Sequence, residues 1–376
     1  MKRRIYFDHA GTTIPDPEII RTYESLLEQY FANSESLYSE GTEVHRMMEK
    51  ARSAAAGLLG VSANEVLFTS GSCESNSTAI KGVCFAEPSK KHIITTAVEH
   101  SSVLNACRQM ERLFGYEVTF LKPDSSGRIP AEDVRQALRP DTCIVSVMMV
   151  NNETGALNPI EEIKTIVRKE SRAYFHCDMT QAAGKIPLSL KDIDLAAISA
   201  HKIHGLKGSG ILVKKSYVPM EPLISGGEQE FGFRGGTANA PADMVFAKTL
   251  RLAFERQPAF AEHTRMLHDR LRKGLSEIDG ILFNSDESGL PCILNFSFEA
   301  IPSEVMQNEL NRRGFMISAR STCESHSNNP SYVLLAMGCS ERRASCSIRV
   351  SLGAENTIEE ADAFVTAVKE ITEQYG

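Results

Sequence analysis

Apolar and polar positions alternate along the chain in blocks that predict helices and strands in turn. Residues 43–59 carry apolar side chains at helical spacing, and Gly60 directly after them is a typical helix stop. A short apolar run over residues 66–69 predicts a strand, and residues 74–85 predict the next helix. Six further runs predict strands, and several of them are apolar throughout, as in the strands of a parallel sheet that helices cover on both faces. These runs are residues 93–96, 117–121, 143–150, 173–177, 195–198 and 210–213.

The pattern changes at about residue 256. A long charged helix is predicted over residues 259–278, and fewer strand–helix repeats follow it. A chain of 376 residues is long enough for two domains. We therefore expect a large α/β domain with a mostly parallel sheet, followed by a smaller second domain.

Composition and charge exclude several classes of protein. The apolar share of 42% and the charged share of 24% are typical of a globular protein, and the net charge of -7 argues against sequence-independent binding to nucleic acid. No apolar run approaches the roughly 20 residues that span a bilayer, and after its first basic residues the N-terminus turns polar, unlike a signal peptide. The nine cysteines, Cys339 and Cys346 included, lack zinc-like spacing. We therefore expect reduced thiols, a cytoplasmic location and no metal site.

Polar side chains gather where the predicted strands end. Because ligands of open parallel sheets bind at the carboxyl ends of the strands, we expect these side chains to line one polar pocket. Any one of them alone could be a helix cap or a turn. Together they bring an anion-binding turn, an imidazole, an amide, a carboxylate and an amine to one edge of the sheet. The segments are residues 70–76, 99–100, 151–155, 178–181 and 199–202.

Lys202 is the most informative of these residues. It follows a buried strand and precedes a glycine-rich turn, after which the strand-like run of residues 210–213 begins. A lysine held at a strand end in a pocket can lose enough proton affinity to become a nucleophilic amine, the form that condenses with a carbonyl cofactor. Taken alone, the same pattern also fits a surface lysine beside a turn.

Three further groups have both a chemical and a structural interpretation. The turn Ser70–Cys73 leads into a helix. Its chemical interpretation is a phosphate site, because the free N–H groups and the positive dipole end at a helix N-terminus attract an anion. Its structural interpretation is an ordinary Ser/Gly turn that caps the helix. Asp178 at a buried strand end needs a partner, which could be a protonated pyridine nitrogen, a salt bridge or a helix cap. His100 could stack on a flat ring and move protons near neutral pH, or it could be structural.

Taken in order, these segments resemble the NifS/IscS-type cysteine desulfurases, which are pyridoxal phosphate (PLP) enzymes of the class V aminotransferase group. The lysine segment, Ser199–Lys202 followed by Gly205–Gly208, carries the resemblance most specifically. The resemblance implies PLP-dependent transferase fold type I: a large PLP-binding domain over residues 14–255, and a small α+β domain formed by residues 1–13 and 256–376 that carries the catalytic cysteine loop. The other matching blocks, in order, are residues 6–13, 99–100, 151–155, 176–181, 236–237, 321–323 and 348–352.

The resemblance also implies a role for each matching residue. Lys202 would hold PLP covalently and later remove the substrate Cα proton, Asp178 would pair with the pyridine nitrogen, and His100 would stack on the ring. Arg349 would bind the substrate carboxylate, for which a guanidinium fork is well suited, and Asn33 is also assigned to the substrate. The other cofactor contacts implied are Asn152 and Gln181 with the ring substituents, Ser72, Cys73, Ser199 and His201 with the phosphate, and Thr237 with the phosphate of the neighbouring subunit. Such sharing of active sites implies a homodimer.

Cys323 would be the catalytic nucleophile. It lies in a hydrophilic stretch, residues 318–330, that predicts a loop instead of a helix or strand. A mobile loop suits a thiol that must reach the substrate sulfur and then carry the sulfur outward. Only the thiolate attacks, and Arg320 and His326 are close enough in sequence to raise the thiolate fraction.

The reaction implied is removal of sulfur from L-cysteine to give L-alanine and a persulfide on Cys323. The persulfide would pass to a sulfur-acceptor protein, such as an Fe–S scaffold or a tRNA-thiolation enzyme. A selenocysteine lyase or related PLP lyase, and a partner-binding homologue with weakened catalysis, are the alternatives. A dinucleotide binder is disfavoured because no GxGxxG follows the first strand.

Several positions depart from the pattern of that family. Cys73 stands where threonine is usual at the phosphate, so a weaker thiol replaces a hydroxyl. His9 and Gly11 replace the usual asparagine and alanine, and Ala354 replaces an arginine. Phe231 interrupts a Gln-Glu-Arg-Gly pattern and so removes a positive charge. Further along the same comparison, Ser34 and Tyr38 replace a proline and a histidine.

Overall fold

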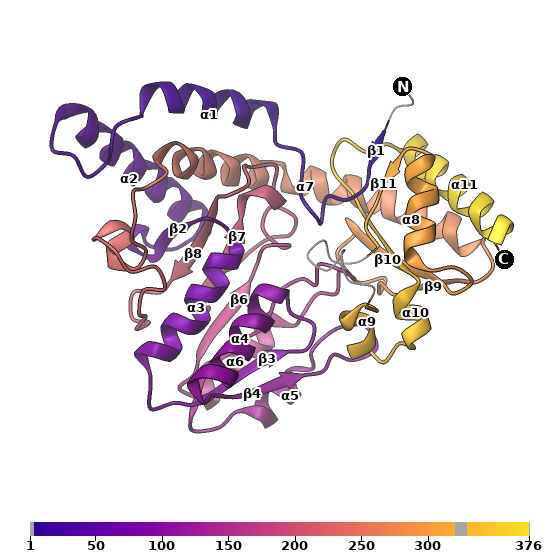
Figure 1. The fold of residues 1–376 in the computed structure, drawn as a ribbon, viewed down its shortest axis with the longest axis horizontal. Coiled ribbons are helices and arrows are strands. Elements are labelled where there is room, and N and C mark those ends of the chain that lie inside the picture. Colours follow the sequence, from indigo (N-terminus) through magenta and orange to yellow (C-terminus); the bar gives the residue numbers. More distant parts are fainter. Residues whose placement is uncertain (1–3, 320–328, 376) are drawn as a thin grey trace.

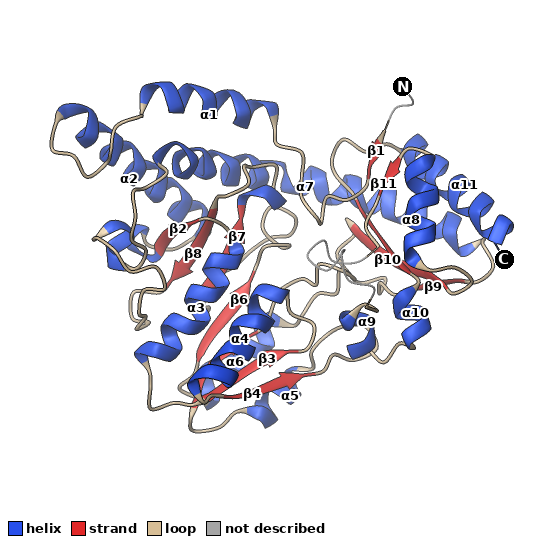
Figure 2. Cartoon of the chain, in the orientation of Figure 1, coloured by secondary structure: helices blue, strands red, loops and turns tan. Residues whose placement is uncertain are grey.

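The computed structural model describes residues 4–319 and 329–375. Figure 1 shows one part built on a large twisted sheet and, beside it, a smaller part that holds both ends of the described chain. Helices and strands alternate through the larger part (Figure 2). No helix in the described part of the chain combines the length and the apolar character needed to cross a membrane.

A seven-stranded sheet, in the order β2-β8-β7-β6-β5-β3-β4, forms the core of the larger part. β8 runs antiparallel to its neighbours β2 and β7, and the remaining pairs are parallel. The sheet is thus mostly parallel, as the apolar runs predict. Its strands are β2 (Val66–Thr69), β3 (His92–Thr96), β4 (Glu117–Leu121), β5 (Thr142–Ser146), β6 (Tyr174–Asp178), β7 (Leu195–Ser199) and β8 (Gly210–Lys214).

Helices cover both faces of this sheet, because successive residues of each central strand point to opposite sides. Ile93, Ile144 and Leu195 join one buried cluster with α3 and α4, whereas Ile94, Val145 and Ala196 join a second cluster on the other face. Burial on both faces explains why these strands are largely apolar and show no alternation of apolar and polar positions. The helices of this part are α1 (Pro17–Gln29), α2 (Ser39–Leu59), α3 (Ser72–Ala86), α4 (Ser101–Phe114), α5 (Ala131–Ala137) and α6 (Ile160–Glu170).

The smaller part contains two short sheets. β9 and β12 both pair antiparallel with β10, and β1 pairs with β11 in a parallel pair. β1 thus joins the N-terminal segment to the C-terminal third of the chain. The strands are β1 (Ile5–Tyr6), β9 (Ile281–Phe283), β10 (Ile293–Phe298), β11 (Phe315–Met316) and β12 (Ser347–Ser351), and the helices are α8 (Ser303–Arg312), α9 (Tyr332–Ala336), α10 (Glu341–Ser345) and α11 (Ile358–Tyr375).

The long helix α7 (Ala240–Ser276) connects the two parts. It begins 19 residues before the helix start that we expected at residue 259, because Ala240–Leu250 is buried nearly throughout and therefore shows no amphipathic stripe. α7 runs without interruption through residues 255 and 256, where we expected the chain to pass from one domain to the other.

Two other boundaries differ from the predicted ones. β5 ends at Ser146, four residues before the expected end, because the Met148 N–H donates to the Glu99 carboxyl group instead of to a neighbouring strand. α2 begins at Ser39, four residues before the predicted start, in a first turn that carries polar side chains. The helix predicted over residues 74–85 matches α3 to within two residues at each end.

Candidate active site

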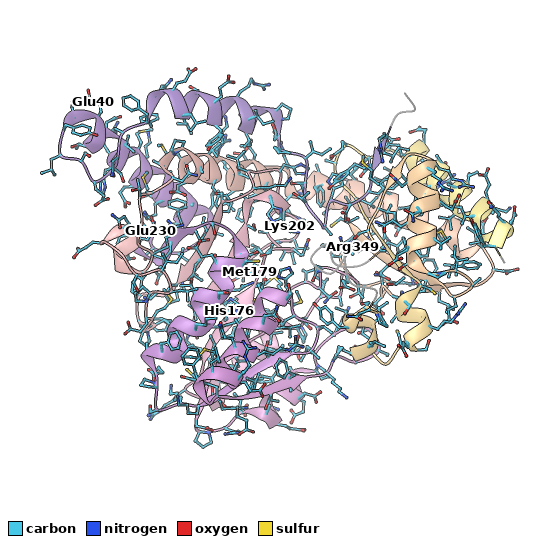
Figure 3. The ribbon with its side chains drawn as sticks, in the orientation of Figure 1. Glu40, His176, Met179, Lys202, Glu230 and Arg349 are labelled. Atoms are coloured by element: carbon cyan, nitrogen blue, oxygen red, sulfur yellow. The ribbon has the colours of Figure 1, made fainter. Side chains whose placement is uncertain are left out.

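The polar residues predicted at the strand ends lie at the carboxyl edge of β6 and β7, close to the N-terminus of α3. Asp178 ends β6 and Ser199 ends β7, and these neighbouring strands pair Asp178 with Ala197. A 3-10 turn directly after β7, Ala200–Lys202, carries the lysine. Figure 3 places Lys202 and Arg349 near the middle of the molecule, one on each side of the boundary between its two parts.

Carbonyl oxygens of the N-terminal segment hold the Lys202 amine. The Nζ of Lys202 donates to the Ala10 oxygen at 2.7 Å and to the Gly11 oxygen at 2.5 Å. The Nε2 of Gln181 donates to the same Ala10 oxygen at 3.0 Å, and its Oε1 accepts from the Lys185 Nζ at 2.7 Å. Lys202 and Gln181 therefore share one acceptor on the distant N-terminal segment.

A chain of hydrogen bonds links Asp178 to His100. The Nδ2 of Asn76 donates to Asp178 Oδ2 at 2.7 Å and to Ser102 Oγ at 2.9 Å. The Ser102 Oγ lies 2.8 Å from His100 Nδ1, which also accepts from the Ser102 N–H at 3.2 Å. Because Nδ1 accepts a hydrogen bond, the neutral ring carries its proton on Nε2.

The Asp178 carboxylate is buried, with 5% of its surface exposed, and its oxygens accept from neutral donors. These donors are the Asn76 amide and the backbone N–H of Thr180, at 2.9 Å. Within residues 4–319 and 329–375, no salt bridge pairs Asp178 with a cation. A buried carboxylate without a cation is costly, so this position is suited to a positively charged or N–H-bearing ligand group.

The N-terminus of α3 and the start of β8 form a tight cradle. Gly71 precedes α3 with φ of +143°, a conformation that L side chains rarely adopt, and a Cβ at this position would lie 3.6 Å from Ser199 Oγ. A Cβ at Gly210 would lie 2.4 Å from the Gly71 Cα. Ser72 is buried in the first turn of α3, whereas the Cys73 side chain is exposed. Free N–H groups, the helix dipole and these hydroxyl groups make the cradle a suitable anion site.

His201 lies beside the N-terminal segment. Its Nδ1 is 3.1 Å from Thr12 Oγ1, and its backbone oxygen accepts from the Thr13 N–H at 2.8 Å. Burial and the neighbouring Lys202 lower the pKa of His201 to about 4. The ring is therefore neutral at pH 7 and can donate one hydrogen bond.

Arg349 is the largest fully buried side chain, with 1% exposed. Its NH2 donates to Asp8 Oδ1 at 2.8 Å and its NH1 to the backbone oxygen of Asn152 at 2.9 Å. The Nε of Arg349 and the Oδ1 of Asn152 are buried without a hydrogen-bond partner in the described part of the chain. These two orphaned polar atoms identify where a ligand with acceptor and donor groups would be stabilised.

Asn33 lies apart from this cluster in the single chain, whereas Thr237 lies beside the turn that leads into α3. Asn33 is exposed on the loop between α1 and α2, and its Oδ1 accepts from the Glu35 N–H at 3.0 Å. Figure 1 shows that loop at the left end of the molecule. Thr237 is exposed just before α7 and lines a cavity of about 270 Å³ together with Ser70 and Gly208. Cys323, Arg320 and His326 lie outside the described residues.

Sequence reasoning placed Asn76 and Asp8 inside segments expected at the site but gave neither a role, and it did not identify Ser102. Asn76 follows Ser72 by one helical turn, so its position on the same face of α3 was a usable signal. Asp8 lies within a matching block, but its partner Arg349 is 341 residues away and only the fold brings the two together.

Glu99 is a further buried group behind the site. Its Oε1 accepts from the Met148 N–H at 2.8 Å and from Thr96 Oγ1 at 3.0 Å. Burial, together with the nearby Asp178 charge, raises the pKa of Glu99 to about 8. The side chain is therefore mostly a neutral acid at pH 7.

The chain resembles known proteins along nearly its whole length. The model of the family described as aminotransferase class-V matches residues 5–364. A protein of Anaeromyxobacter sp. (strain K) described as "Cysteine desulfurase IscS" is 41% identical over 370 residues, covering 96% of this chain and 91% of that protein. A solved structure titled "NIFS-LIKE PROTEIN" is 36% identical with a TM-score of 0.92, covering 99% of this chain and all of the other. Another, titled "SspA in complex with cysteine", is 33% identical with a TM-score of 0.82, covering 92% and 98%.

Proposed function

Since this chain belongs to the aminotransferase class-V family and is of the NifS/IscS type, we propose that it is a PLP-dependent cysteine desulfurase. The single observation that supports this most strongly is the joint geometry of Lys202, Asp178 and the cradle of α3. These three features provide an amine, an unpaired buried carboxylate and an anion site along one sheet edge. PLP carries an aldehyde, a ring nitrogen and a phosphate, one for each feature.

The residues present fit this cofactor. The Asp178 carboxylate would accept from the ring nitrogen, which would supply the positive partner that the described chain does not provide. Ser72, Cys73, Ser199 and His201 would hold the phosphate, His100 would stack on the ring, and Asn152 and Gln181 would contact its substituents. The orphaned Oδ1 of Asn152 supports that assignment, because a buried acceptor is normally satisfied.

When bound, PLP supplies an electron sink for the charge that develops at the substrate Cα. The protein residues provide the remaining functions. Lys202 would hold the cofactor until the substrate amine takes its place. As a free amine it would then take the Cα proton. The Ala10 and Gly11 oxygens that now accept from its Nζ would orient the amine. Arg349 would bind the substrate carboxylate with its unused Nε–H, its position being fixed by Asp8 and Asn152.

The substrate we propose is L-cysteine, which a related protein of solved structure is titled as binding. The Cys323 thiolate would attack the substrate sulfur, so that the carbon–sulfur bond breaks and a sulfur–sulfur bond forms. A proton would replace sulfur on the substrate carbon, giving L-alanine and a persulfide on Cys323. The persulfide is a reversible modification, suited to transfer to an Fe–S scaffold or a tRNA-thiolation enzyme.

We also propose a homodimer in which Thr237 reaches the phosphate site of the partner subunit. Thr237 is exposed in the single chain, as are Phe31 (79%), Leu37 (98%) and Phe231 (48%). Exposed apolar side chains gathered on the α1–α2 loop and beside the segment before α7 are typical of an interface. No disulfide bond joins any two of the eight described cysteines, which supports action in the reducing cytoplasm.

The test is to load the purified protein with PLP, add L-cysteine, and measure alanine together with the mass of the peptide that contains Cys323. We expect alanine and one added sulfur atom on that peptide. Lys202→Ala should abolish the absorption of the bound cofactor, and Cys323→Ala should abolish sulfur transfer while the cofactor still binds. Cys339→Ala is the matched control, since Cys339 is the partly exposed thiol of the α9–α10 turn and should retain both activities. Alanine formation that continues in Cys323→Ala would contradict the proposed role of this thiol.

A further inference from the structure

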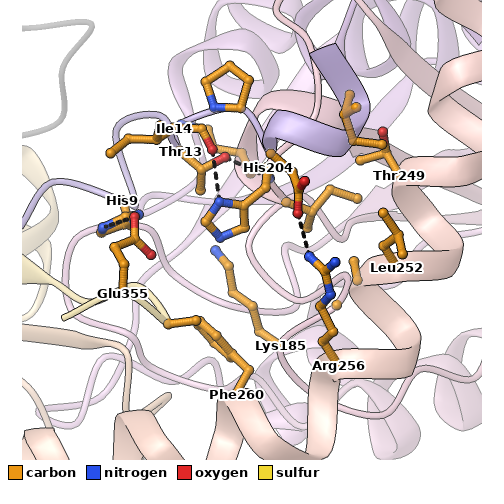
Figure 4. Close-up of a pocket in the computed structure, with 18 of the residues that line it drawn as sticks. His9, Thr13, Ile14, Lys185, His204, Thr249, Leu252, Arg256, Phe260 and Glu355 are labelled. Atoms are coloured by element: carbon orange, nitrogen blue, oxygen red, sulfur yellow. Dashed lines mark hydrogen bonds and ion pairs between the residues drawn. The ribbon is translucent and has the colours of Figure 1, made fainter. Parts of the chain in front are cut away.

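A second group of side chains lies beside Lys202, on a cavity that Lys202 also lines but whose other lining residues have no role in the proposed reaction. The cavity measures about 760 Å³ and lies between the N-terminal segment, the middle of α7 and the turn after β12. His9, His204 and Glu355 line it together, from three separate segments of the chain (Figure 4). Their ligand atoms (one imidazole nitrogen from each histidine and one carboxylate oxygen) all lie within 4.8 Å of one another.

His9 is the unusual member of this group. It is 97% buried, with 3% of its surface exposed, yet neither Nδ1 nor Nε2 has a hydrogen-bond partner among the described residues. Its Nε2 lies 3.4 Å from Glu355 Oε1. Buried polar atoms without partners are rare, and a neutral imidazole nitrogen is a metal ligand.

His204 presents its ring in the form that a metal requires. Its Nδ1 lies 2.9 Å from the Ile14 oxygen, so Nδ1 carries the proton and Nε2 keeps its lone pair. Metal-bound histidines commonly donate their second nitrogen to a carbonyl or carboxylate in this way. His204 also has φ of +63°, a backbone conformation that non-glycine residues adopt only where the surroundings impose it.

We propose that His9, His204 and Glu355 bind a divalent transition-metal ion with the ligand preference of Zn²⁺. Two imidazoles and one carboxylate are a common three-ligand set for zinc, with the fourth position left for water. In a tetrahedron with bonds of about 2.0–2.1 Å, ligand atoms lie about 3.4 Å apart, and the pair His9–Glu355 already has this separation. The Glu355 carboxylate is 42% exposed and can adjust its position.

The backbone at Gly353 leaves room for His9 and Glu355 to lie close together. A Cβ at Gly353 would lie 2.4 Å from His9 Cε1 and 2.5 Å from Glu355 Oε2, so a side chain there would separate the two ligands. The fourth position would face the cavity, which Lys185 and Phe260 also line. The inference does not depend on the proposed desulfurase activity, because its evidence is geometry outside the residues assigned to that reaction.

Metal binding would join segments that the proposed active site depends on. His9 precedes Ala10 and Gly11, whose oxygens accept from Lys202, and His204 follows Lys202 by two residues. Glu355 lies in the turn between β12, which carries Arg349, and α11. A bound ion would therefore hold the lysine segment, the N-terminal segment and the smaller part of the molecule in one arrangement.

The experiment measures metal affinity in the full-length, PLP-loaded protein after treatment with a chelator. Zn²⁺ is titrated in competition with a chromophoric chelator, and Co²⁺ is used in parallel as a spectroscopic probe. We expect stoichiometric binding and a Co²⁺ spectrum with ligand-field bands but without a thiolate charge-transfer band. His9→Asn, which introduces the residue usual in the family, and Glu355→Gln should weaken binding at least about tenfold, the scale that losing even an outer-shell partner costs.

The control variant is His45→Asn, which removes an exposed histidine of α2 and should bind as the wild type does. Unfolding temperatures measured without metal show whether each variant is folded. If His9→Asn does not fold, Glu355→Gln still tests the proposal, because Glu355 is partly exposed. Equal affinity of wild type and Glu355→Gln, or a Co²⁺ spectrum dominated by thiolate, would overturn the proposal. Loss of alanine formation with unchanged metal binding would count only against the proposed function.

Discussion

At the scale of single residues, Glu99 makes stability depend on pH. Its pKa is raised from 4.5 to about 8, so between these values the folded chain keeps a proton that the unfolded chain has lost. The contribution of Glu99 to stability is therefore complete below pH 4.5 and declines as pH rises toward 8, by about 1.4 kcal/mol per pH unit and a few kcal/mol in total. Glu99→Gln, which mimics the neutral acid, should remove this decline.

The measurement is urea unfolding of the wild type and Glu99→Gln from about pH 5 to about pH 8. The difference in unfolding free energy between wild type and Glu99→Gln separates the effect of Glu99 from that of histidines that titrate in the same range. It should grow in favour of glutamine as pH rises. Glu111→Gln, at an exposed position of α4, is the control and should give a constant difference. Parallel curves for Glu99→Gln and the wild type would show that the carboxyl group ionises normally.

Asn76 is the other single residue with a specific expectation, because it positions Asp178 without belonging to the cofactor contacts. Its side-chain amide donates a hydrogen bond to the Asp178 carboxylate, and a hydrogen bond to a charged group is worth about 1.5–3 kcal/mol. Asn76→Ala should therefore lower kcat/KM for L-cysteine by about 10- to 100-fold and shift the pH at which the absorption of bound PLP changes. Asn105→Ala, at an exposed position of α4, should change neither. An unchanged pH profile in Asn76→Ala would mean that its role is structural alone.

At the scale of elements, the junction between α3 and β8 depends on glycine. Gly210→Ala would bring a Cβ to 2.4 Å from the Gly71 Cα, so the strand and the helix must separate. We expect a loss of about 1–3 kcal/mol in the free energy of unfolding, the usual cost of overpacking, and weaker retention of PLP on dialysis. Gly57→Ala in α2 is the matched control, because a Cβ there meets nothing within 4 Å and alanine should stabilise the helix by roughly 0.5–1 kcal/mol. Full PLP retention in Gly210→Ala would contradict the cradle assignment.

At the scale of the whole molecule, the exposed apolar side chains predict the oligomeric state. Leu37 is 98% exposed on the α1–α2 loop, a position that a free surface does not favour. Leu37→Glu should weaken dimerisation by about 30-fold, as loss of a central contact worth about 2 kcal/mol does. Alanine formation should fall with it, because Thr237 would no longer reach the partner subunit. Sedimentation velocity measures the loss of dimerisation.

Leu113→Glu is the control for this surface. Leu113 is also apolar and 57% exposed, but it belongs to α4, which Figure 1 shows away from the α1–α2 loop. It should leave both association and activity unchanged. Dimers that persist in Leu37→Glu would place the interface elsewhere.

In the larger part, the order of the strands followed from local pattern, and the exceptions have physical causes. Central strands such as β5 and β7 were predictable because both faces are apolar. The first half of α7 was not, because a helix buried on nearly all sides has no polar stripe to mark it. The predicted boundary between the large and the small domain, at residues 255 and 256 inside α7, stays a prediction.

The sequence by itself determined the mostly parallel sheet, the strand ends that carry Asp178 and Lys202, and the family, because each depends on neighbours in the chain. Only the tertiary structure decided which distant residues meet. Arg349 with Asp8, Gln181 with the carbonyl group that accepts from Lys202, and His9 with His204 and Glu355 are examples. Local pattern records which face of an element is buried, but it carries no record of what is packed against that face, so contacts between distant segments become visible only in the fold.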